Sequence, residues 1–318
     1  MEKCPIEICH QIFRAACVDG GKTGIALSQV SRYVNQMSRE VKYHSVTVIG
    51  LDQIMMFAKV LKDLPPKYRV VRHLFLSSMP QKTSPDDDIT PTLNQEIGQV
   101  GAEKHYEGVC DAFSLILELS APTLFSFYLV SRIPRTVNML PVSLPMLMEL
   151  TIHGPFPAVS KAELREHTYP SLQRLTFVGF SDHPLDLFED IAFQAPNLTH
   201  LSFFPSQPSR HLHEDLCSAL NIPTMSDKHA VQEVPAVGTL PASIVRVEVQ
   251  PGPRPQDKKG SRRRSVLMDK VQEVMRARVL FMQRRDKRVK YIEPGPVPSY
   301  CDAKLLWLQE RANWGDDS

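Results

Sequence analysis

Four segments of this 318-residue chain share one pattern, which constrains the fold more than any other feature. Each reads Pro-x-Leu-x-x-(Leu or Phe)-x-apolar, and the successive prolines lie 23, 25 and 26 residues apart. The segments are APTLFSFYL (121–129), LPMLMELTI (144–152), YPSLQRLTF (169–177) and APNLTHLSF (195–203). Three further segments keep the apolar spacing without the proline: Tyr43/Val46/Val48, Val71/Leu74/Leu76 and Ile244/Val247/Val249.

The spacing within each segment predicts a short strand. Residues two apart point to the same side of a strand, so the last two apolar residues of each segment face one core. A single unit cannot bury that face, whereas stacked neighbours can. A period in the twenties with this spacing is typical of leucine-rich repeats.

Helical patterns lie between these strands, at 51–64, 105–119, 158–166, 184–194 and 211–220. Strands separated by helices predict parallel pairing with right-handed crossovers. The asparagine that usually follows the leucine-rich core is absent, because the corresponding positions hold Arg132, Pro155, Phe180 and Ser206. We therefore expect an α/β fold, an irregular leucine-rich-repeat solenoid with a parallel sheet over residues 46–318. The alternative is an ordinary α/β domain with leucine-rich strands.

Two polar, turn-rich stretches, 77–104 and 205–239, interrupt the rhythm and are predicted to be exposed loops. A basic segment follows at 258–290, with thirteen Lys or Arg against three acidic residues in a chain whose net charge is +2. Its apolar spacing and the sequence VKYIEPG predict a helix and a final strand, and Leu305, Leu306, Trp307 and Leu308 predict a terminal helix that caps the solenoid. We interpret the charge as a solvated surface and expect no nucleic-acid partner; a nuclear-import or nucleic-acid patch is the alternative.

The stretch ACVDGGKTGIA (16–26) resembles a nucleotide-binding loop, with Lys22 and Thr23 in the phosphate-binding positions. Such a loop follows a buried strand, whereas the residues before it recur at helical spacing. Gly20 and Gly21 then read as a helix stop, followed by a second helical pattern. A helix–glycine turn–helix is therefore expected, with nucleotide binding as the alternative.

Other chemistry finds little support in the sequence. The stretch RHLHEDLC (210–217) contains three possible metal ligands, His211, His213 and Cys217. On a helix His213 and Cys217 share a face but His211 does not, so we expect no metal site. We find no nucleophile elbow, zinc-protease motif or dinucleotide fingerprint, and we predict neither an enzyme nor a cofactor.

The six cysteines form no C-x-x-C pair, and the chain shows no membrane span or secretory signal. A reduced, intracellular protein of the cytoplasm, the nucleus or both is expected.

Residues 1–45 carry a recognisable arrangement of motifs. CPIEI (4–8) gives a helix start, Ile12-Phe13 an apolar pair, and LSQVSR (27–32) precedes a strand that begins in YHSVTV (43–48). This order resembles the F-box of fungal F-box-like proteins with degenerate leucine-rich repeats. Cys4 stands where that family usually has leucine, and Tyr33 where it often has tryptophan.

The resemblance implies a non-enzymatic substrate receptor of a cullin–RING ubiquitin ligase, whose F-box docks a Skp-type adaptor. It also implies which apolar side chains would be exposed as anchors: Pro5, Ile6, Ile8, Ile12, Phe13, Leu27 and Val30. In the alternatives these residues pack the helices on the repeat domain, or the chain is a binding or scaffold protein with no ligase link.

The repeat strands also predict where a target protein would bind. Residues that flank the second repeat leucine point away from the core, because side chains alternate along a strand. The predicted target-binding stripe is Ser126, Tyr128, Glu149, Thr151, Arg174, Thr176, His200, Ser202, Arg246 and Glu248. Tyr128 and Arg174 are the expected hot spots, since Tyr and Arg contribute much of the energy of protein interfaces.

Overall fold

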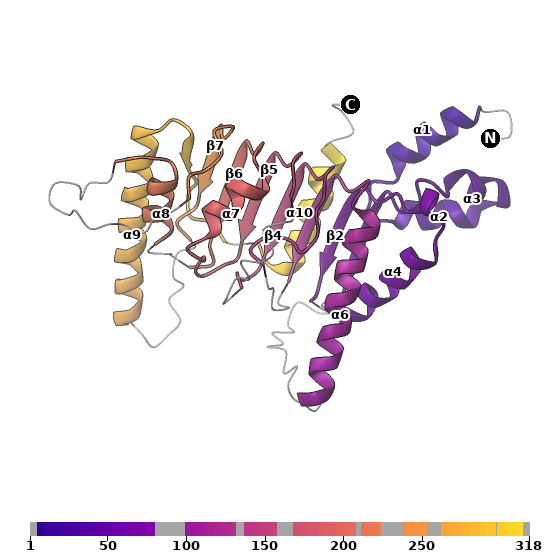
Figure 1. Ribbon diagram of the computed structural model, residues 1–318, viewed down its shortest axis with the longest axis horizontal. Helices are drawn as coiled ribbons and strands as arrows, with labels where there is room; N and C mark the ends of the chain where they lie inside the picture. The colour runs from indigo at the N-terminus through magenta and orange to yellow at the C-terminus, as the bar shows by residue number, and fades with distance from the viewer. Residues whose placement is uncertain are drawn as a thin grey trace. The chain divides into compact units, whose positions relative to one another are not determined.

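The computed structural model describes residues 5–79, 99–131, 137–157, 168–207, 211–223, 238–252, 262–296 and 298–313. The chain divides into two compact units, and Figure 1 labels most of their helices and strands. Unit 1 comprises Met1–Ile133 with Pro298–Ser318, and unit 2 comprises Pro134–Val297. Both units are mixed α/β with parallel strands, as the sequence predicts at the level of fold class. The units do not coincide with the two predicted domains, because the first three strands belong with the N-terminal helices.

Unit 1 begins with three short helices, α1 (Ile6–Ala16), α2 (Lys22–Val30) and α3 (Arg32–Ser38). Pro5 precedes α1, where its fixed φ suits a helix start. The Ser31 side chain caps α3 by accepting a hydrogen bond from the Val34 amide at 3.1 Å. Gly20 and Gly21, both with positive φ, make the turn between α1 and α2. The predicted helix–glycine turn–helix is confirmed.

Three parallel strands follow in chain order: β1 (Ser45–Ile49), β2 (His73–Ser77) and β3 (Ser126–Val130). The crossovers contain α4 (Leu51–Asp63) with the short η1 (Pro66–Tyr68), and α6 (Gln99–Ser120). The repeat residues Val46, Leu74 and Phe127 pair in register, and so do Val48, Leu76 and Leu129. All six are buried, because they alternate toward the face that α4 and α6 cover.

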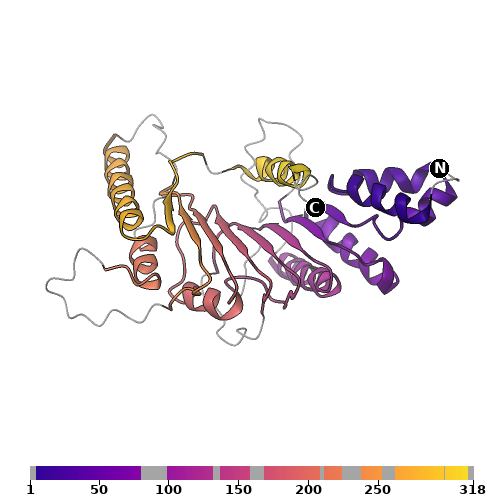
Figure 2. The same ribbon diagram turned by 90° about the horizontal axis from the view of Figure 1, so that it is seen from above.

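The last helix of unit 1, α10 (Tyr300–Asn313), lies on the opposite face of these strands from α6 (Figure 2). Ala303 and Trp307, one turn apart, are buried against Phe75 and Tyr128. The Trp307 and Phe75 ring centroids are 5.6 Å apart, and Phe75 stacks on Tyr128 at 5.2 Å. The predicted terminal helix forms, and in unit 1 it covers a sheet face.

The described residues of unit 2 contain five parallel strands in chain order: β4 (Glu149–His153), β5 (Arg174–Val178), β6 (His200–Phe204), β7 (Arg246–Val249) and β8 (Val289–Tyr291). Leu150, Leu175, Leu201, Val247 and Val289 form one buried cross-strand row. Ile152, Phe177, Phe203 and Val249 form a second such row. Every strand predicted from the repeat is confirmed, and so is the final strand.

Where the structure describes unit 2, its helices are α7 (Leu187–Gln194), α8 (Leu212–Ala219) and α9 (Arg262–Arg285). Phe188 of α7 packs edge-on against Phe203 of β6, with ring centroids 6.0 Å apart. Met275, Val279 and Met282 of α9 are buried, whereas Lys270, Arg284 and Arg285 are exposed. The basic segment is therefore a helix with one apolar face, followed by β8.

Two sequence expectations need comment. The predicted loop 77–104 is too long, because β2 includes Ser77 and α6 begins at Gln99. The predicted helix over 158–166 lies outside the described residues, and so do parts of the 205–239 stretch.

Candidate interaction sites

The three N-terminal helices have a small core of their own. Cys9, Phe13 and Cys17 lie one turn apart on α1 and at its end, and they pack with Val34 and Val41. Phe13 is only 3% exposed, so the prediction that it is a free anchor is wrong. Its position between Cys9 and Cys17 at helical spacing places it inward. Leu27 is half-buried and packs on the same core.

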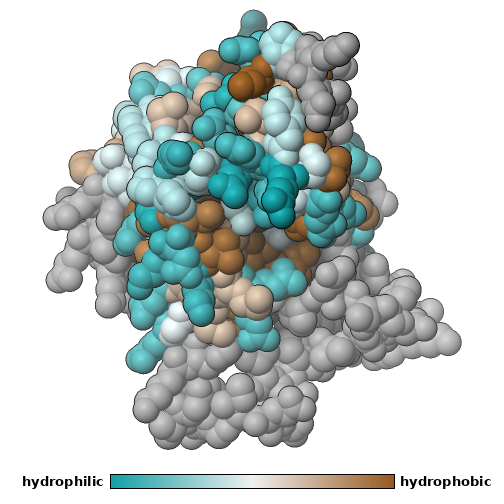
Figure 3. All heavy atoms as spheres, turned by 90° about the vertical axis from the view of Figure 1, so that its right-hand side faces the viewer, coloured by the Kyte–Doolittle hydropathy of each residue, from teal (hydrophilic) through white to brown (hydrophobic). Residues whose placement is uncertain are grey.

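The remaining predicted anchors are exposed. Pro5 lies on the surface, and Ile6, Ile8, Ile12 and Val30 are 50%, 43%, 52% and 66% exposed. Ile25 of α2, 55% exposed, belongs with them and was missed, because the sequence pattern favoured Leu27 and Val30. We call Ile6, Ile8, Ile12, Ile25 and Val30 the exposed apolar residues of α1 and α2. Figure 3 views the side on which Figure 1 draws these helices, and hydrophobic side chains reach the surface there among hydrophilic ones.

The glycine turn holds an anionic group of its own. The Asp19 carboxylate accepts hydrogen bonds from the Thr23 amide at 3.0 Å and from the Thr23 hydroxyl at 2.8 Å. The start of α2 is where a phosphate would bind in a nucleotide-binding loop. Here the Asp19 carboxylate of the chain itself occupies the position beside the first turn of α2. The Gly20 amide donates to the Ser45 hydroxyl at 3.3 Å, and the Gly20 carbonyl accepts from the Thr47 amide at 3.2 Å, so the turn is tied to β1.

In unit 1 the predicted target-binding stripe is covered. Ser126 is 2% exposed and Tyr128 is 7% exposed, so the expectation that they face solvent is wrong. The physical reason is α10, whose Trp307 fills the space above β2 and β3. Burial, reinforced by the nearby Glu310 charge, raises the pKa of Tyr128 well above its usual value.

In unit 2 the predicted stripe is accessible. Arg174 is exposed, and the side chains that accompany it are partly exposed: Glu149, Thr151, Thr176, His200, Ser202, Arg246 and Glu248. Arg174 contacts Glu149 at 3.3 Å. Glu248 contacts Arg246 at 2.7 Å and Lys290 at 3.6 Å. We call these eight residues with Lys290 the open sheet face of unit 2.

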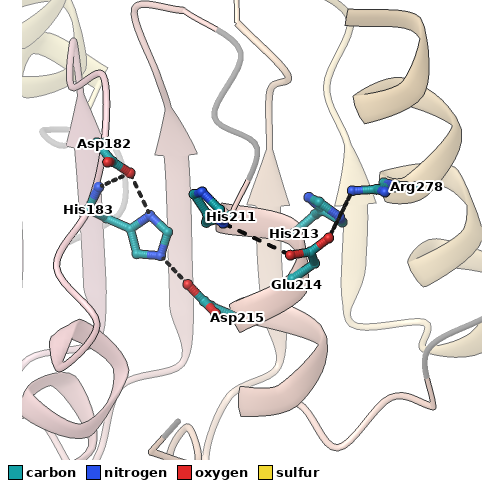
Figure 4. A network of polar contacts seen from close by, with 7 residues as sticks. All are labelled: Asp182, His183, His211, His213, Glu214, Asp215 and Arg278. Carbon is teal, nitrogen blue, oxygen red and sulfur yellow. Dashed lines mark hydrogen bonds and ion pairs between the residues drawn. The ribbon is translucent and has the colours of Figure 1, made fainter. Parts of the chain in front are cut away.

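The polar residues of 211–215 contact two different neighbours, His183 and Arg278, and do not converge on one site (Figure 4). His183, in the loop after β5, donates from Nε2 to Asp215 of α8 at 2.9 Å, and its side chain is 2% exposed. Arg278 of α9 donates to His213 and also contacts Glu214 at 3.2 Å. Burial, and secondarily the Arg278 charge, lowers the pKa of His213 to about 4, so its ring is neutral and accepts from Arg278. These contacts join α8 to the β5–α7 loop and to α9.

His211 points to Glu214 at 4.0 Å and takes no part in the contacts that His183 and Arg278 make. Within the described residues, no three His, Cys, Asp or Glu side chains are arranged so that they could hold a metal ion. None of the helices in the described part of the chain combines the length and the hydropathy that a bilayer crossing requires.

Comparisons with known proteins gave no match at the level of family, curated sequence or solved structure.

Proposed function

We propose that this chain is a non-enzymatic adaptor, the substrate receptor of a cullin–RING ubiquitin ligase. In this proposal α1–α3 are an F-box that docks a Skp-type adaptor protein, and the strands and helices that follow are an irregular leucine-rich-repeat solenoid that captures a target. Its place of action would be the cytoplasm, the nucleus or both. The proposal assigns no catalytic group, cofactor or nucleic-acid partner to the chain.

The observation that supports the proposal most is the set of exposed apolar residues of α1 and α2. The helices already have a core in Cys9, Phe13 and Val34, so the exposed isoleucines are not needed to close it. Burying an isoleucine side chain fully is worth about 1.5–3 kcal/mol, so several such side chains left in water favour a partner. Ile8 and Ile12 lie one turn apart on α1, a spacing that lets one partner surface contact both.

The second half of the proposal concerns target capture. A receptor that holds its target beside a ubiquitin-charged enzyme acts by raising the effective concentration of the target. The open sheet face of unit 2 offers charged and hydroxyl side chains for this purpose. Solenoids use extended sheet surfaces of this kind for binding.

The test is binding to a Skp-type adaptor, measured by co-purification and by calorimetry. We expect Ile8→Glu with Ile12→Glu to lower the affinity at least about a hundredfold, because each new carboxylate would have to be buried without a partner. Both side chains are at least 43% exposed in the free chain, so the variant is expected to fold. Phe13→Glu is unsuitable, since it would place a charge inside the helical core.

Met56→Glu with Val60→Glu is the matched control. These residues are also apolar, one helical turn apart and exposed, at 69% and 39%, but they lie on α4. The control should bind the adaptor like the unaltered chain. If both double variants bind normally, α1 is not the docking element. If the unaltered chain binds no adaptor of this type, the chain is a binding or scaffold protein without a ligase link.

A further inference from the structure

Three residues that can carry positive charge stand side by side on the open sheet face of unit 2. In the parallel register Arg174 of β5 pairs with His200 of β6, and His200 pairs with Arg246 of β7. Neighbouring strands lie about 4.8 Å apart, so the two arginines flank the histidine at nearly equal distance. The positive charges of the two arginines disfavour a proton on the histidine ring between them, whereas an anion bound at this row would interact favourably with both arginines.

The carboxylates of the same face compensate the row only in part. Glu149 contacts Arg174 through one oxygen at 3.3 Å, and the Arg174 side chain stays 60% exposed. Glu248 divides its contacts between Arg246 and Lys290, whose side chains are 42% and 50% exposed. Among the described residues of this face, three permanent cations therefore accompany two carboxylates, before any proton on His200 is counted. A guanidinium has five N–H donors, so both arginines retain donors for a further oxyanion.

Hydrogen bonding orients the His200 ring. The Thr199 hydroxyl donates its one proton to the Gln173 carbonyl at 2.9 Å. The same hydroxyl lies 2.9 Å from Nδ1 of His200, so it accepts there and Nδ1 carries the proton. Nε2 is then the ring atom that gains a proton when His200 becomes charged, and that proton is available to a ligand.

Hydroxyl groups line the next cross-strand row. Thr151, Thr176 and Ser202 pair in register, two residues along the strands from the charged row and on the same face. Ser202 donates to Glu248 at 3.5 Å. The row adds hydroxyl donors beside the arginines, a combination suited to an oxyanion.

We propose that Arg174, His200 and Arg246, with the Thr176 hydroxyl beside them, form a binding site for an oxyanion carried by a side chain of the target polypeptide. The oxyanion is a phosphoryl group or a carboxylate, since both accept from guanidinium and hydroxyl donors. This inference rests on the proposed function for the nature of the target, but the site itself belongs to the chain alone.

The pKa of His200 should change when an anion binds at this site. Burial, and then the charges of Arg174 and Arg246, lower the pKa of His200, while Glu248 opposes them. The charged groups that face it are thus Arg174 on β5 and Arg246 and Glu248 on β7, with Glu149 further along the row on β4. A bound anion reverses the repulsion, so it should raise the pKa of His200 and draw in a proton at Nε2.

The experiment is an NMR titration of the imidazole signals of the full chain, with the His200 signal assigned by its loss in His200→Gln. Inorganic phosphate, acetate and, as reference, chloride are compared at equal ionic strength. We expect phosphate, acetate or both to raise the pKa of His200 above its value in chloride. Arg174→Gln with Arg246→Gln should weaken this response roughly tenfold or more in anion concentration. Arg276→Gln removes a cation of similar exposure on α9 and should leave the response unchanged.

A response to phosphate but not to acetate assigns a phosphoryl ligand, and the reverse assigns a carboxylate. The proposal is overturned if neither anion moves the pKa of His200 beyond chloride, or if the double arginine variant responds like the unaltered chain. No adaptor is present in the titration, so its outcome is independent of adaptor binding. A chain that binds the oxyanion but no Skp-type adaptor would refute the ligase link and leave this site in place.

Discussion

Gly24 shows how a single residue sets the packing of the N-terminal helices. It is buried in the first turn of α2, and a Cβ atom there would collide with the carbonyl oxygen of Lys42. The α2 backbone can approach the segment before β1 only because this position has no side chain. Gly108 of α6 is different, since apart from its chain neighbours and the backbone of its own helix, no described atom lies within 4 Å of the place where its Cβ would be.

The two glycines make a matched pair for mutation. Gly24→Ala should lower the free energy of unfolding by about 1–3 kcal/mol, because the collision involves backbone that cannot rotate away. Gly108→Ala should raise it by about 0.5–1 kcal/mol, since alanine favours a helix over glycine. Urea unfolding followed by circular dichroism measures both changes. Equal effects in the two variants would show that helix propensity, and not the contact with Lys42, decides the outcome.

At the scale of single elements, α10 depends on one large side chain. Trp307 is 1% exposed and packs against Phe75. Leu305 of the same helix is 59% exposed. Removing a buried tryptophan leaves a large cavity, which typically costs 3–5 kcal/mol.

We therefore expect Trp307→Ala to destabilise unit 1 by about 3–5 kcal/mol and to expose the Tyr128 ring. Leu305→Ala, its control on the outer face, should change stability by less than about 0.5 kcal/mol. Urea unfolding gives the energies, and near-ultraviolet circular dichroism follows the environment of the aromatic rings. A Trp307→Ala variant with unaltered stability would mean that α10 does not hold this sheet face.

The elements differed in how far the sequence could predict them. The strands were predictable because Leu150, Leu175 and Leu201 recur at a fixed offset from a proline, and a buried face needs that recurrence. The position of α10 was not, since Ala303 and Trp307 at helical spacing show an apolar face without showing what it covers. For the same reason the prediction that Tyr128 is exposed was wrong. Its side chain does point away from the helices α4 and α6, but Trp307 of α10 covers it. Arg174 has no such cover, and its predicted exposure is confirmed.

At the scale of the whole molecule, buried histidines in both units link stability to pH. Burial lowers the pKa of His44, His153 and His213 to about 4 and that of His73 to about 3. Nearby arginines lower it further for His44, His73 and His213. An unfolded chain binds these protons near pH 6.5, so between pH 6.5 and about 4 it holds more protons than the folded chain. Stability is therefore greatest above pH 6.5 with respect to these groups and falls as the pH drops through this window.

The free energy of unfolding should decrease by up to about 1.4 kcal/mol per pH unit for each such histidine. His153→Gln removes one of the groups that take up a proton on unfolding. The free energy of unfolding of this variant should therefore fall less steeply as the pH drops. His211→Gln, at a side chain that is 68% exposed, should leave the slope unchanged. Urea unfolding at a series of pH values between 7 and 5 measures the slopes, and parallel curves for His153→Gln and the unaltered chain would contradict the assignment.

The return of the chain to unit 1 has a consequence for biosynthesis. Strands β2 and β3 emerge from the ribosome early, yet the Trp307 that covers Phe75 and Tyr128 is synthesised more than 170 residues after Tyr128. Unit 2 is made entirely within that interval, because it spans Pro134–Val297. During translation an aromatic surface therefore stays bare while a later domain is completed, which is the situation in which nascent chains aggregate or recruit chaperones. Chain elongation, and not the folding of the first strands, sets the earliest moment at which unit 1 can close.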